Sequence, residues 1–543
     1  MRGLMMDTPL LISSILRHAE RNFPEREIVS VTGDNPAHRY TYADCCRRTR
    51  QLANALGKLD LSEGDRVATI AWNDYRHLEI YYAVGGAGYV CHTINPRLFP
   101  EQIIFMINHA EDKWIMTDPM FLPLLEKIAD QTPHVEGYVV LTDDAHMPET
   151  SLKNVVSYES LINDEKDEFE WPQLDENSAL GLCYTSGTTG DPKGVLFSHR
   201  STILHAYAGI APDALNLSSR DCVLPVVPLF HVNAWGIPYA TMIVGAKIVF
   251  PGPKMGDGEA LYNMLEEESV TMALGVPTVW LALLQYAKSA GKRLNKLQRT
   301  LIGGAAVPES MIREFFVDHD VVVHQGWGMT EMSPLGTVNT FKAGMESLSQ
   351  DEKFRVQTKA GRGIFGCEIK IVDDDNNELP WDGVAFGALR VRGPWICSDY
   401  FKLDGAANSH IDGWFDTGDV ATIDENGFLA ITDRTKDVIK SGGEWISSIE
   451  IENTAIGHSS VAEAAVIGVA HPKWTERPLL IVIKAEGAEL SKEDMLAYLD
   501  GKIAKWWLPD DVVFVDEIPH TATGKIKKID LRKQFADYQL PGQ

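Results

Sequence analysis

The sequence predicts an α/β protein in which a large layered α/β domain is followed by a smaller α+β domain. Through most of the 543 residues, short apolar runs typical of buried strands alternate with segments of helical spacing. Such alternation produces a mostly parallel, layered sheet. The length agrees, because at roughly 100–200 residues per domain a chain of this size contains at least two domains.

The first elements show the pattern. Residues 42–59 have helical spacing and follow Thr41, whose hydroxyl suits an N-cap. Residues 66–72 are a short apolar run bounded by polar residues, and residues 114–117 and 137–141 repeat it. We therefore expect one amphipathic helix and three buried strands in this region.

The chain changes character at a charged segment, residues 433–437. Strand signals follow it at 464–469 and 479–483, and helical signals accompany them. This change predicts a domain boundary, with an N-terminal domain of residues 1–433 and a C-terminal domain of residues 434–543.

Composition excludes several classes of partner. With 50 Lys and Arg against 76 Asp and Glu, the formal charge is −26, which repels phosphate backbones and anionic lipid. We expect no nucleic-acid partner. The acidic stretch 143–177 is expected to run over the surface. The most apolar long window, residues 224–250, is interrupted by prolines and polar residues, so we expect no stable membrane insertion.

The cysteines and the N-terminus predict a cytoplasmic location. The seven cysteines are odd in number and scattered, which favours free thiols in a reducing compartment. The first residues lack the shape of a signal peptide.

Residues 184–194 are the strongest local motif and read Y-T-S-G-T-T-G-D-P-K-G. Its glycines allow close backbone approach, and its hydroxyls and lysine are donors that suit a polyphosphate. The spacing is not that of a Walker A loop. On composition alone, a surface loop without a ligand is an equally good interpretation.

The full order of that loop, however, resembles the phosphate loop of the adenylate-forming superfamily, which contains acyl-CoA synthetases, luciferases and carrier-protein adenylation domains. Five further motifs resemble those of the family and follow in its order: residues 303–306, 325–331, 414–419, 433–444 and 523–525. The resemblance implies ATP and CoA as co-substrates, Mg²⁺ as the metal, and a C-terminal domain that is mobile.

The same resemblance implies the central roles. Lys525 would be the catalytic cation between the carboxylate and the α-phosphate, a task that suits a compact charge. His231 would position the reacting carboxylate, and Trp235 would gate the acyl tunnel. Thr185 and Glu331 would hold Mg²⁺, which prefers oxygen ligands. Taken alone, such residues are more often solvated charges or core side chains, so these roles depend on the motifs.

The remaining implied contacts surround the nucleotide. Asp419 would accept hydrogen bonds from the ribose, Arg434 would contact ribose or phosphate, and Lys436 would be the hinge. Trp327 replaces the usual tyrosine and would offer its flat face to adenine. The whole implied nucleotide-binding set is Thr185, Ser186, Gly187, Thr188, Thr189, Gly190, Lys193, Gly303, Gly304, Gln325, Gly326, Trp327, Thr330, Glu331, Asp419, Arg434, Lys436, Lys440 and Trp445. Gly326 would also face the acyl group, together with His231 and Trp235.

Within the superfamily, residues 231–236 and 440–447 resemble fatty-acyl-CoA synthetases. Residues 145–150 and 326–331 are similar to bacterial 3-methylmercaptopropionate-CoA ligases of dimethylsulfoniopropionate breakdown. The implied function is ATP-dependent acid–CoA ligation of a small carboxylic acid, and the related synthetases imply a homodimer. Three alternatives stay open: a medium- or long-chain fatty-acid–CoA ligase, an enzyme that loads a carrier protein or oxidises its adenylate, and an inactive nucleotide sensor.

Overall fold

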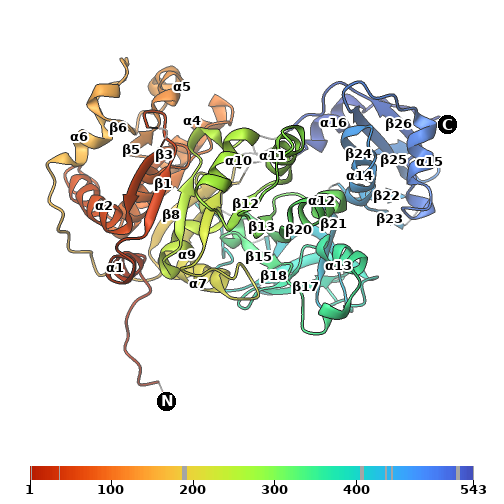
Figure 1. Cartoon of the computed structure of the whole chain (residues 1–543), viewed down its shortest axis with the longest axis horizontal. Helices are drawn as coiled ribbons and strands as arrows, with labels where there is room; N and C mark the ends of the chain where they lie inside the picture. Colours follow the sequence, from red (N-terminus) through yellow and green to blue (C-terminus); the bar gives the residue numbers. More distant parts are fainter. Residues whose placement is uncertain are drawn as a thin grey trace.

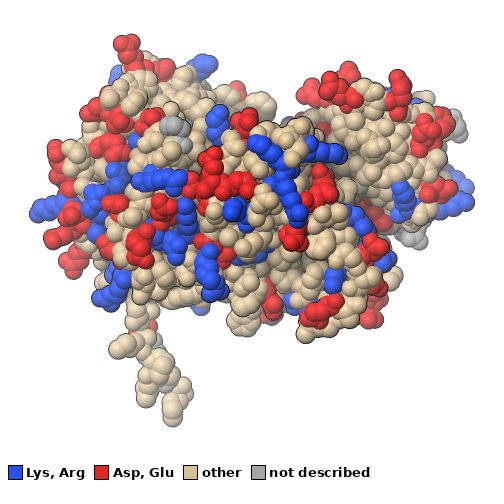
Figure 2. Space-filling view, viewed as in Figure 1, with Lys and Arg blue, Asp and Glu red and all other residues tan. Residues whose placement is uncertain are grey.

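The computed structural model describes residues 1, 3–35, 37–185, 192–403, 409–434, 437–441, 444–520 and 526–541, without the side chains of residues 444 and 445. The chain forms a large lobe and a smaller C-terminal lobe (Figure 1). Figure 2 shows acidic and basic side chains mixed over the viewed face and a notch between the two lobes.

The first large sheet contains seven strands among the described residues, in the order β7-β6-β5-β3-β4-β8-β9. All neighbours in it are parallel except β8 and β9. Its strands are β3 (Arg66–Ile70), β4 (Val90–Thr93), β5 (Trp114–Thr117), β6 (Gly137–Val140), β7 (Val155–Ser157), β8 (Ala179–Tyr184) and β9 (Gly194–Ser198).

The second large sheet has nine strands in the described part of the chain, in the order β16-β15-β14-β13-β12-β10-β11-β1-β2. Its central strands are parallel, and antiparallel strands close both edges. The strands are β1 (Glu27–Ser30), β2 (His38–Thr41), β10 (Cys222–Pro225), β11 (Lys247–Phe250), β12 (Met272–Gly275), β13 (Arg299–Ile302), β14 (Val322–Gly328), β15 (Leu335–Val338) and β16 (Arg362–Gly363).

Helices cover and separate these sheets (Figure 1). All twelve residues of α3 are buried, so this helix is part of the core rather than a surface layer. The helices of the large lobe are α1 (Ser13–Asn22), α2 (Tyr42–Leu56), α3 (Tyr75–Gly86), α4 (Pro100–Ala110), α5 (Leu122–Ile128), α6 (Tyr158–Asn163), α7 (His199–Ile210), α8 (Val232–Trp235), α9 (Ile237–Val244), α10 (Gly258–Glu267), α11 (Pro277–Ser289), α12 (Glu309–His319) and α13 (Gln350–Gln357).

A third, largely antiparallel sheet completes the large lobe and leads to the small one. It consists of β17 (Glu368–Val372), β18 (Phe386–Arg392), β19 (His410–Ile411), β20 (Trp414–Ile423) and β21 (Leu429–Arg434).

The small lobe has its own mixed sheet, with β22 (Ile439–Ser441), β23 (Glu444–Ile446), β24 (Val461–His471), β25 (Thr475–Lys484) and β26 (Asp511–Phe514). Its helices are α14 (Ser448–Ile456), α15 (Lys492–Leu499) and α16 (Lys528–Gln534). The buried apolar residues of this lobe form clusters separate from those of the large lobe, as expected for an independent domain. The predicted α/β class with a smaller second domain is confirmed, while the boundary at residue 433 stays a prediction.

Most of the individual elements match their sequence patterns. Thr41 caps α2 with a capping box, and the runs at 66–72, 114–117 and 137–141 become β3, β5 and β6. The acidic stretch 143–177 is more ordered than expected, because β7 and α6 lie within it and Tyr158 is fully buried.

The remaining sequence expectations concern membranes and thiols. No helix in the described part of the chain is long and apolar enough to cross a membrane. All seven cysteines lie in described residues and are free, as predicted; six are buried, and Cys397 is partly buried.

Candidate functional site

Asp419 is the centre of the first group of predicted site residues. It lies on β20 and is only 3% exposed. The indole Nε1 of Trp327, from β14, donates a hydrogen bond to Asp419 Oδ2 at 3.0 Å. Arg434 pairs with Asp419 in the β20–β21 register, and its Nε lies 2.8 Å from Asp419 Oδ1. The structure therefore brings together residues of three different motifs, with Trp327 separated from Asp419 by 92 positions in the sequence.

Glu331 is the centre of the second group. It lies in a short 3₁₀ turn (Thr330–Met332) directly after β14 and is buried. Its Oε1 accepts a hydrogen bond from the Tyr400 hydroxyl at 2.7 Å, and the Cys397 N–H donates to its carbonyl at 2.8 Å. Burial raises the pKa of Tyr400, and the negative charge of Glu331 raises it further. Tyr400 therefore stays a neutral donor that fixes the carboxylate.

The two ends of the glycine-rich loop are paired with each other. Thr185 N–H donates to the Lys193 carbonyl at 2.9 Å, and Lys193 N–H donates to Thr185 Oγ1 at 3.2 Å. The Lys193 ammonium lies 4.8 Å from the centre of the Tyr400 ring. The loop thus ends next to Tyr400, the residue that donates to Glu331. Its predicted phosphate contacts Ser186, Gly187, Thr188, Thr189 and Gly190 lie outside the described residues.

The donor set around Glu331 fits a hard divalent cation. Within the described residues, Glu331 Oε2 accepts no hydrogen bond, so one carboxylate oxygen is available beside the one that Tyr400 holds. Thr185 adds a hydroxyl oxygen at the start of the loop. Carboxylate and hydroxyl oxygens are the ligands that Mg²⁺ takes together with phosphate oxygens.

Two glycines allow close packing between the predicted acyl and adenine motifs. A Cβ on Gly303 would lie 3.0 Å from the Gly326 carbonyl oxygen and 3.1 Å from the Trp235 indole. Gly304, which follows, has φ +82°. Gln325 is buried next to Gly326, and its Oε1 has no hydrogen-bond partner among the described residues. Trp235, Gly303 and Gly326 are therefore neighbours.

The segment after His231 has an unusual backbone. An ordinary right-handed α-helix would place Trp235 about one turn beyond His231. Instead α8 is a left-handed turn: φ is +45°, +55°, +44° and +58° at Val232, Asn233, Ala234 and Trp235. Such values cost roughly 1–2 kcal/mol per residue for side chains other than glycine. Gly236 ends the turn with φ +80°.

Side-chain contacts hold this unusual turn in place. The Tyr81 hydroxyl donates to Asn233 Oδ1 at 3.1 Å, and the Cys183 thiol lies 3.6 Å from the same oxygen. Behind the turn, a Cβ on Gly236 would lie 2.8 Å from the ring of His205. Strained backbone that neighbouring groups fix in this way is typical of functional sites.

The C-terminal candidates are placed only in part. Lys440 and Trp445 face each other across the β22–β23 hairpin, and the Lys440 N–H donates to Glu476 Oε2 at 3.0 Å. Lys436 and Lys525 lie outside the described residues, as do the glycines of the 442–443 loop. Their roles stay predictions.

Sequence reasoning missed two features. Tyr400 was overlooked because nothing in its local sequence marks it, and its partner Glu331 is 69 residues away. The other is a buried polar cluster formed by Asp433, Ser448, Glu452 and Lys528. Asp433 Oδ2 accepts hydrogen bonds from the Ser448 N–H and hydroxyl, Lys528 donates to the same hydroxyl, and Lys528 lies 2.8 Å from Glu452.

The arrangement of these groups agrees with the family models that match the chain. A model described as AMP-binding enzyme matches residues 16–401, and one described as AMP-binding enzyme C-terminal domain matches residues 450–525. The chain therefore belongs to the AMP-binding enzyme family, and the resemblance inferred from its motifs is confirmed.

Similar proteins of known activity cover almost the whole chain. A 3-methylmercaptopropionyl-CoA ligase from Ruegeria lacuscaerulensis is 52% identical over 99% of both chains. A medium-chain-fatty-acid–CoA ligase from Ectopseudomonas oleovorans is 50% identical over 99% of this chain and 98% of the other. The fold resembles that of the anthranilate CoA ligase AuaEII in complex with anthranoyl-AMP, with a TM-score of 0.84, 23% identity and 96% coverage of both chains.

Proposed function

We propose that the chain is an AMP-forming acid–CoA ligase whose preferred acid is 3-methylmercaptopropionate. The observation that carries the proposal is the joint placement of Asp419, Trp327 and Arg434 next to the motif that ends in Glu331. This is a site with a buried ribose acceptor, a flat aromatic ring and a carboxylate for Mg²⁺. The relatives at 50–52% identity support a small or medium acid.

The proposed chemistry has two steps. In the first, an oxygen of the substrate carboxylate attacks the α-phosphorus of ATP, and pyrophosphate leaves, which gives acyl-AMP. In the second, the CoA thiol loses its proton and attacks the acyl carbon, and AMP leaves, which gives the thioester. Mg²⁺, held by Glu331 and Thr185, would neutralise phosphate charge.

The residues of this chain would divide the work as follows. Asp419 would accept from the ribose hydroxyls, and Trp327 would lie against the adenine. His231 would position the carboxylate next to Trp235, which packs on Gly303 and limits the acyl space. Lys525 would offset the negative charge that develops at the α-phosphate. Because Lys525 and the 442–443 loop serve different steps from one small domain, rotation of that domain about Lys436 is part of the proposal.

The acid is tested by measuring kcat/KM for CoA thiol consumption over carboxylic acids of graded length. We expect a maximum at 3-methylmercaptopropionate, because the indoles of Trp235 and Trp327 leave little room and each further buried CH₂ would contribute only about 0.8 kcal/mol. A steady rise from about four to about twelve carbons, roughly tenfold per 1.4 kcal/mol gained, would instead assign the second candidate, a fatty-acid–CoA ligase.

The role of Lys525 is tested by separating the two half-reactions. Lys525→Ala should lower pyrophosphate release at least about 10²-fold, as loss of other transition-state donors does. Thioester formation from supplied acyl-AMP should change much less, because the phosphate charge has already been resolved. Equal loss in both half-reactions would contradict this role.

We propose a homodimer in the cytoplasm, as the resemblance to fatty-acyl synthetases implies. Light scattering of the purified full chain tests the homodimer, and a mass of one chain, 60.3 kDa, would contradict it.

A further inference from the structure

A cavity of about 310 Å³ lies where the two large sheets meet. Trp72 and Asp74 enter its wall just after β3, Asp118 and Met120 just after β5, and Gly252 after β11. The parallel strands run β4-β3-β5-β6-β7 across the sheet. The chain passes from β3 to its neighbour β4 on one side and from β5 to its neighbour β6 on the other, so the topological switch point lies between β3 and β5. Ligands of open α/β sheets bind at such a switch point, outside the carboxyl ends of the strands.

Two carboxylates in the wall of this cavity lack a cation. Asp74 is 4% exposed, and its Oδ1 accepts the His77 N–H at 2.9 Å, which caps α3. Asp118 Oδ2 accepts the Trp72 N–H at 2.7 Å. Within the described residues, neither carboxylate forms an ion pair, and the second oxygen of each accepts no hydrogen bond. The helix cap therefore gives one oxygen of Asp74 a partner, and the contact with Trp72 gives one oxygen of Asp118 a partner. The second oxygen of each carboxylate faces no partner within the described residues.

The electrostatics of the wall agree with a missing positive charge. Burial, together with the nearby charge of Asp74, raises the pKa of Asp118 to about 8, and burial raises the pKa of Asp74 to about 6. Arg76 attracts both carboxylates, but its guanidinium bonds go to Asp34 at 3.0 Å and Glu159 at 2.9 Å. Buried carboxylates are costly unless a cation accompanies them.

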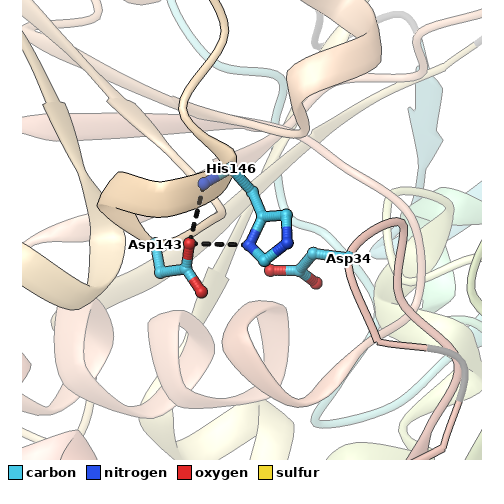
Figure 3. A group of neighbouring side chains, drawn as sticks. All are labelled: Asp34, Asp143 and His146. Carbon is cyan, nitrogen blue, oxygen red and sulfur yellow. Dashed lines mark hydrogen bonds and ion pairs between the residues drawn. The ribbon is translucent and has the colours of Figure 1, made fainter.

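Asp34 and His146, which also line the cavity, form a group with Asp143 (Figure 3). The His146 ring lies between Asp143 and Asp34, with Nδ1 2.8 Å from Asp143 Oδ1. Potential ligand atoms of these three residues lie within 4.8 Å of one another. Asp34 already accepts hydrogen bonds from Arg76 and Thr32, so we assign no metal to this group. The carboxylates of Asp34 and Asp143 add negative potential at this part of the cavity.

The wall also has apolar side chains, among them Val31, Trp72, Met120 and Leu141, and two threonines, Thr32 and Thr142. Apolar walls around a few convergent polar groups are typical of sites for small organic molecules. We propose that this cavity binds a small organic cation, whose ammonium group lies between Asp74 and Asp118 and whose apolar part packs against Trp72.

The cavity is also connected to the predicted acyl site. Asn73, between the two wall residues Trp72 and Asp74, donates to the carbonyls of Pro225 and Val227 at 3.0 and 2.8 Å and accepts from the Leu229 N–H at 2.6 Å. The Trp72 ring lies 5.8 Å from that of Phe230, the residue before His231. A bound cation is therefore expected to change the KM for the acid. This expected change in KM rests on the proposed function, whereas the proposal that the cavity binds a cation does not.

The experiment is calorimetric titration of the full chain with phenethylammonium and with 2-phenylethanol, its neutral analogue of similar shape. The ammonium should bind at one site at least about tenfold more tightly than the alcohol, equivalent to about 1.4 kcal/mol. Asp74→Asn and Asp118→Asn should each weaken it about tenfold. Both variants keep an oxygen that accepts the same N–H, and asparagine caps helices as well as aspartate. Asp494→Asn, at an exposed capping box of α15 in the small lobe, should have no effect.

Several results would overturn the proposal. They are absence of binding, equal affinity for the amine and the alcohol, and unchanged affinity in both aspartate variants that retain the wild-type melting temperature. Displacement of the probe by MnCl₂ would assign the site to a metal instead. Displacement by 3-methylmercaptopropionate would make the cavity part of the acyl site. Unaltered binding with no ligase activity would refute only the proposed function.

Discussion

Trp327 holds the carboxylate of Asp419, the proposed ribose acceptor. Its indole N–H donates to Asp419, while Arg434 occupies the other oxygen of the same carboxylate. The carboxylate that would bind the ribose is thus oriented from two sides before any nucleotide arrives. Preorganised groups of this kind bind their ligand at lower entropic cost.

Trp327→Phe should therefore raise the KM for ATP roughly tenfold, because a hydrogen bond to a charged group contributes about 1.5 kcal/mol or more. The value of kcat should change little, since the phosphates and the carboxylate are held elsewhere. Steady-state kinetics with varied ATP measure this. Trp381→Phe, at an exposed tryptophan of the large lobe, is the control, and an unchanged KM in Trp327→Phe would refute the orienting role.

The left-handed turn α8 contains Trp235, the residue proposed to limit the acyl space. It depends on Gly236, which combines φ +80° with close approach to His205, a residue whose Nε2 accepts the Leu335 N–H at 3.1 Å. No residue other than glycine meets both requirements without strain.

Gly236→Ala should lower the free energy of unfolding by about 2–3 kcal/mol, the sum of the positive φ and the displaced His205 ring. Gly413→Ala is the matched control, since Gly413 has φ +79° and open space where the Cβ would lie; it should cost only about 1 kcal/mol. Urea unfolding compares the two. Equal losses would show that contact with His205 contributes nothing.

The same elements show what the sequence predicts well. Buried strands such as β3 and β5 are apolar runs, so local pattern alone identifies them. The left-handed turn is different, because Val232, Ala234 and Trp235 have no local preference for positive φ and adopt it only under tertiary contacts. Tyr158 on α6 is a similar case: an acidic surrounding sequence conceals a buried tyrosine that donates to Glu79 at 2.6 Å.

The site residues divide in the same way. Asp419, Trp327, Glu331 and Thr185 were identified because each lies in an ordered motif, and the structure brings them together in two groups. Lys528 lies in none of these motifs, and no local sequence pattern indicates that it is paired with Glu452 at 2.8 Å. Burial lowers its pKa, but the charges of Glu452 and Asp433 outweigh burial and raise it. Only the three-dimensional packing of α14 and α16 against the end of β21 reveals this cluster.

At the scale of the whole molecule, buried histidines make stability depend on pH. Burial lowers the pKa of His205 to about 4 from the usual 6.5. As the pH falls through 6.5, the unfolded chain binds a proton here that the folded chain does not bind until about pH 4. This histidine therefore reduces stability progressively across that window.

His205→Gln removes the titration and keeps an acceptor for Leu335. The melting temperature of the variant relative to wild type should rise by a few degrees between pH 7.5 and 5, corresponding to about 2 kcal/mol. Scanning calorimetry at several pH values measures the difference. His134→Gln, at an exposed histidine, should show no such trend, and a constant difference for His205→Gln would contradict the assignment.

The large lobe contains the residues of the proposed nucleotide and acyl sites, and the small lobe follows Arg434, whose side chain contacts Asp419. The buried cluster around Asp433 joins the end of β21 to α14 and α16 of the small lobe. The proposed adenylation site and the small lobe are therefore joined at Arg434, the residue that contacts the proposed ribose acceptor Asp419.

The most direct test of the proposed reaction is its stoichiometry. Purified full-length protein is mixed with MgATP, 3-methylmercaptopropionate and CoA, and pyrophosphate, AMP and thioester are quantified together over time. The account predicts equal amounts of the three products, with no ADP above background and no product when the acid is omitted. Formation of ADP, release of pyrophosphate without consumption of the CoA thiol, or absence of pyrophosphate would contradict it.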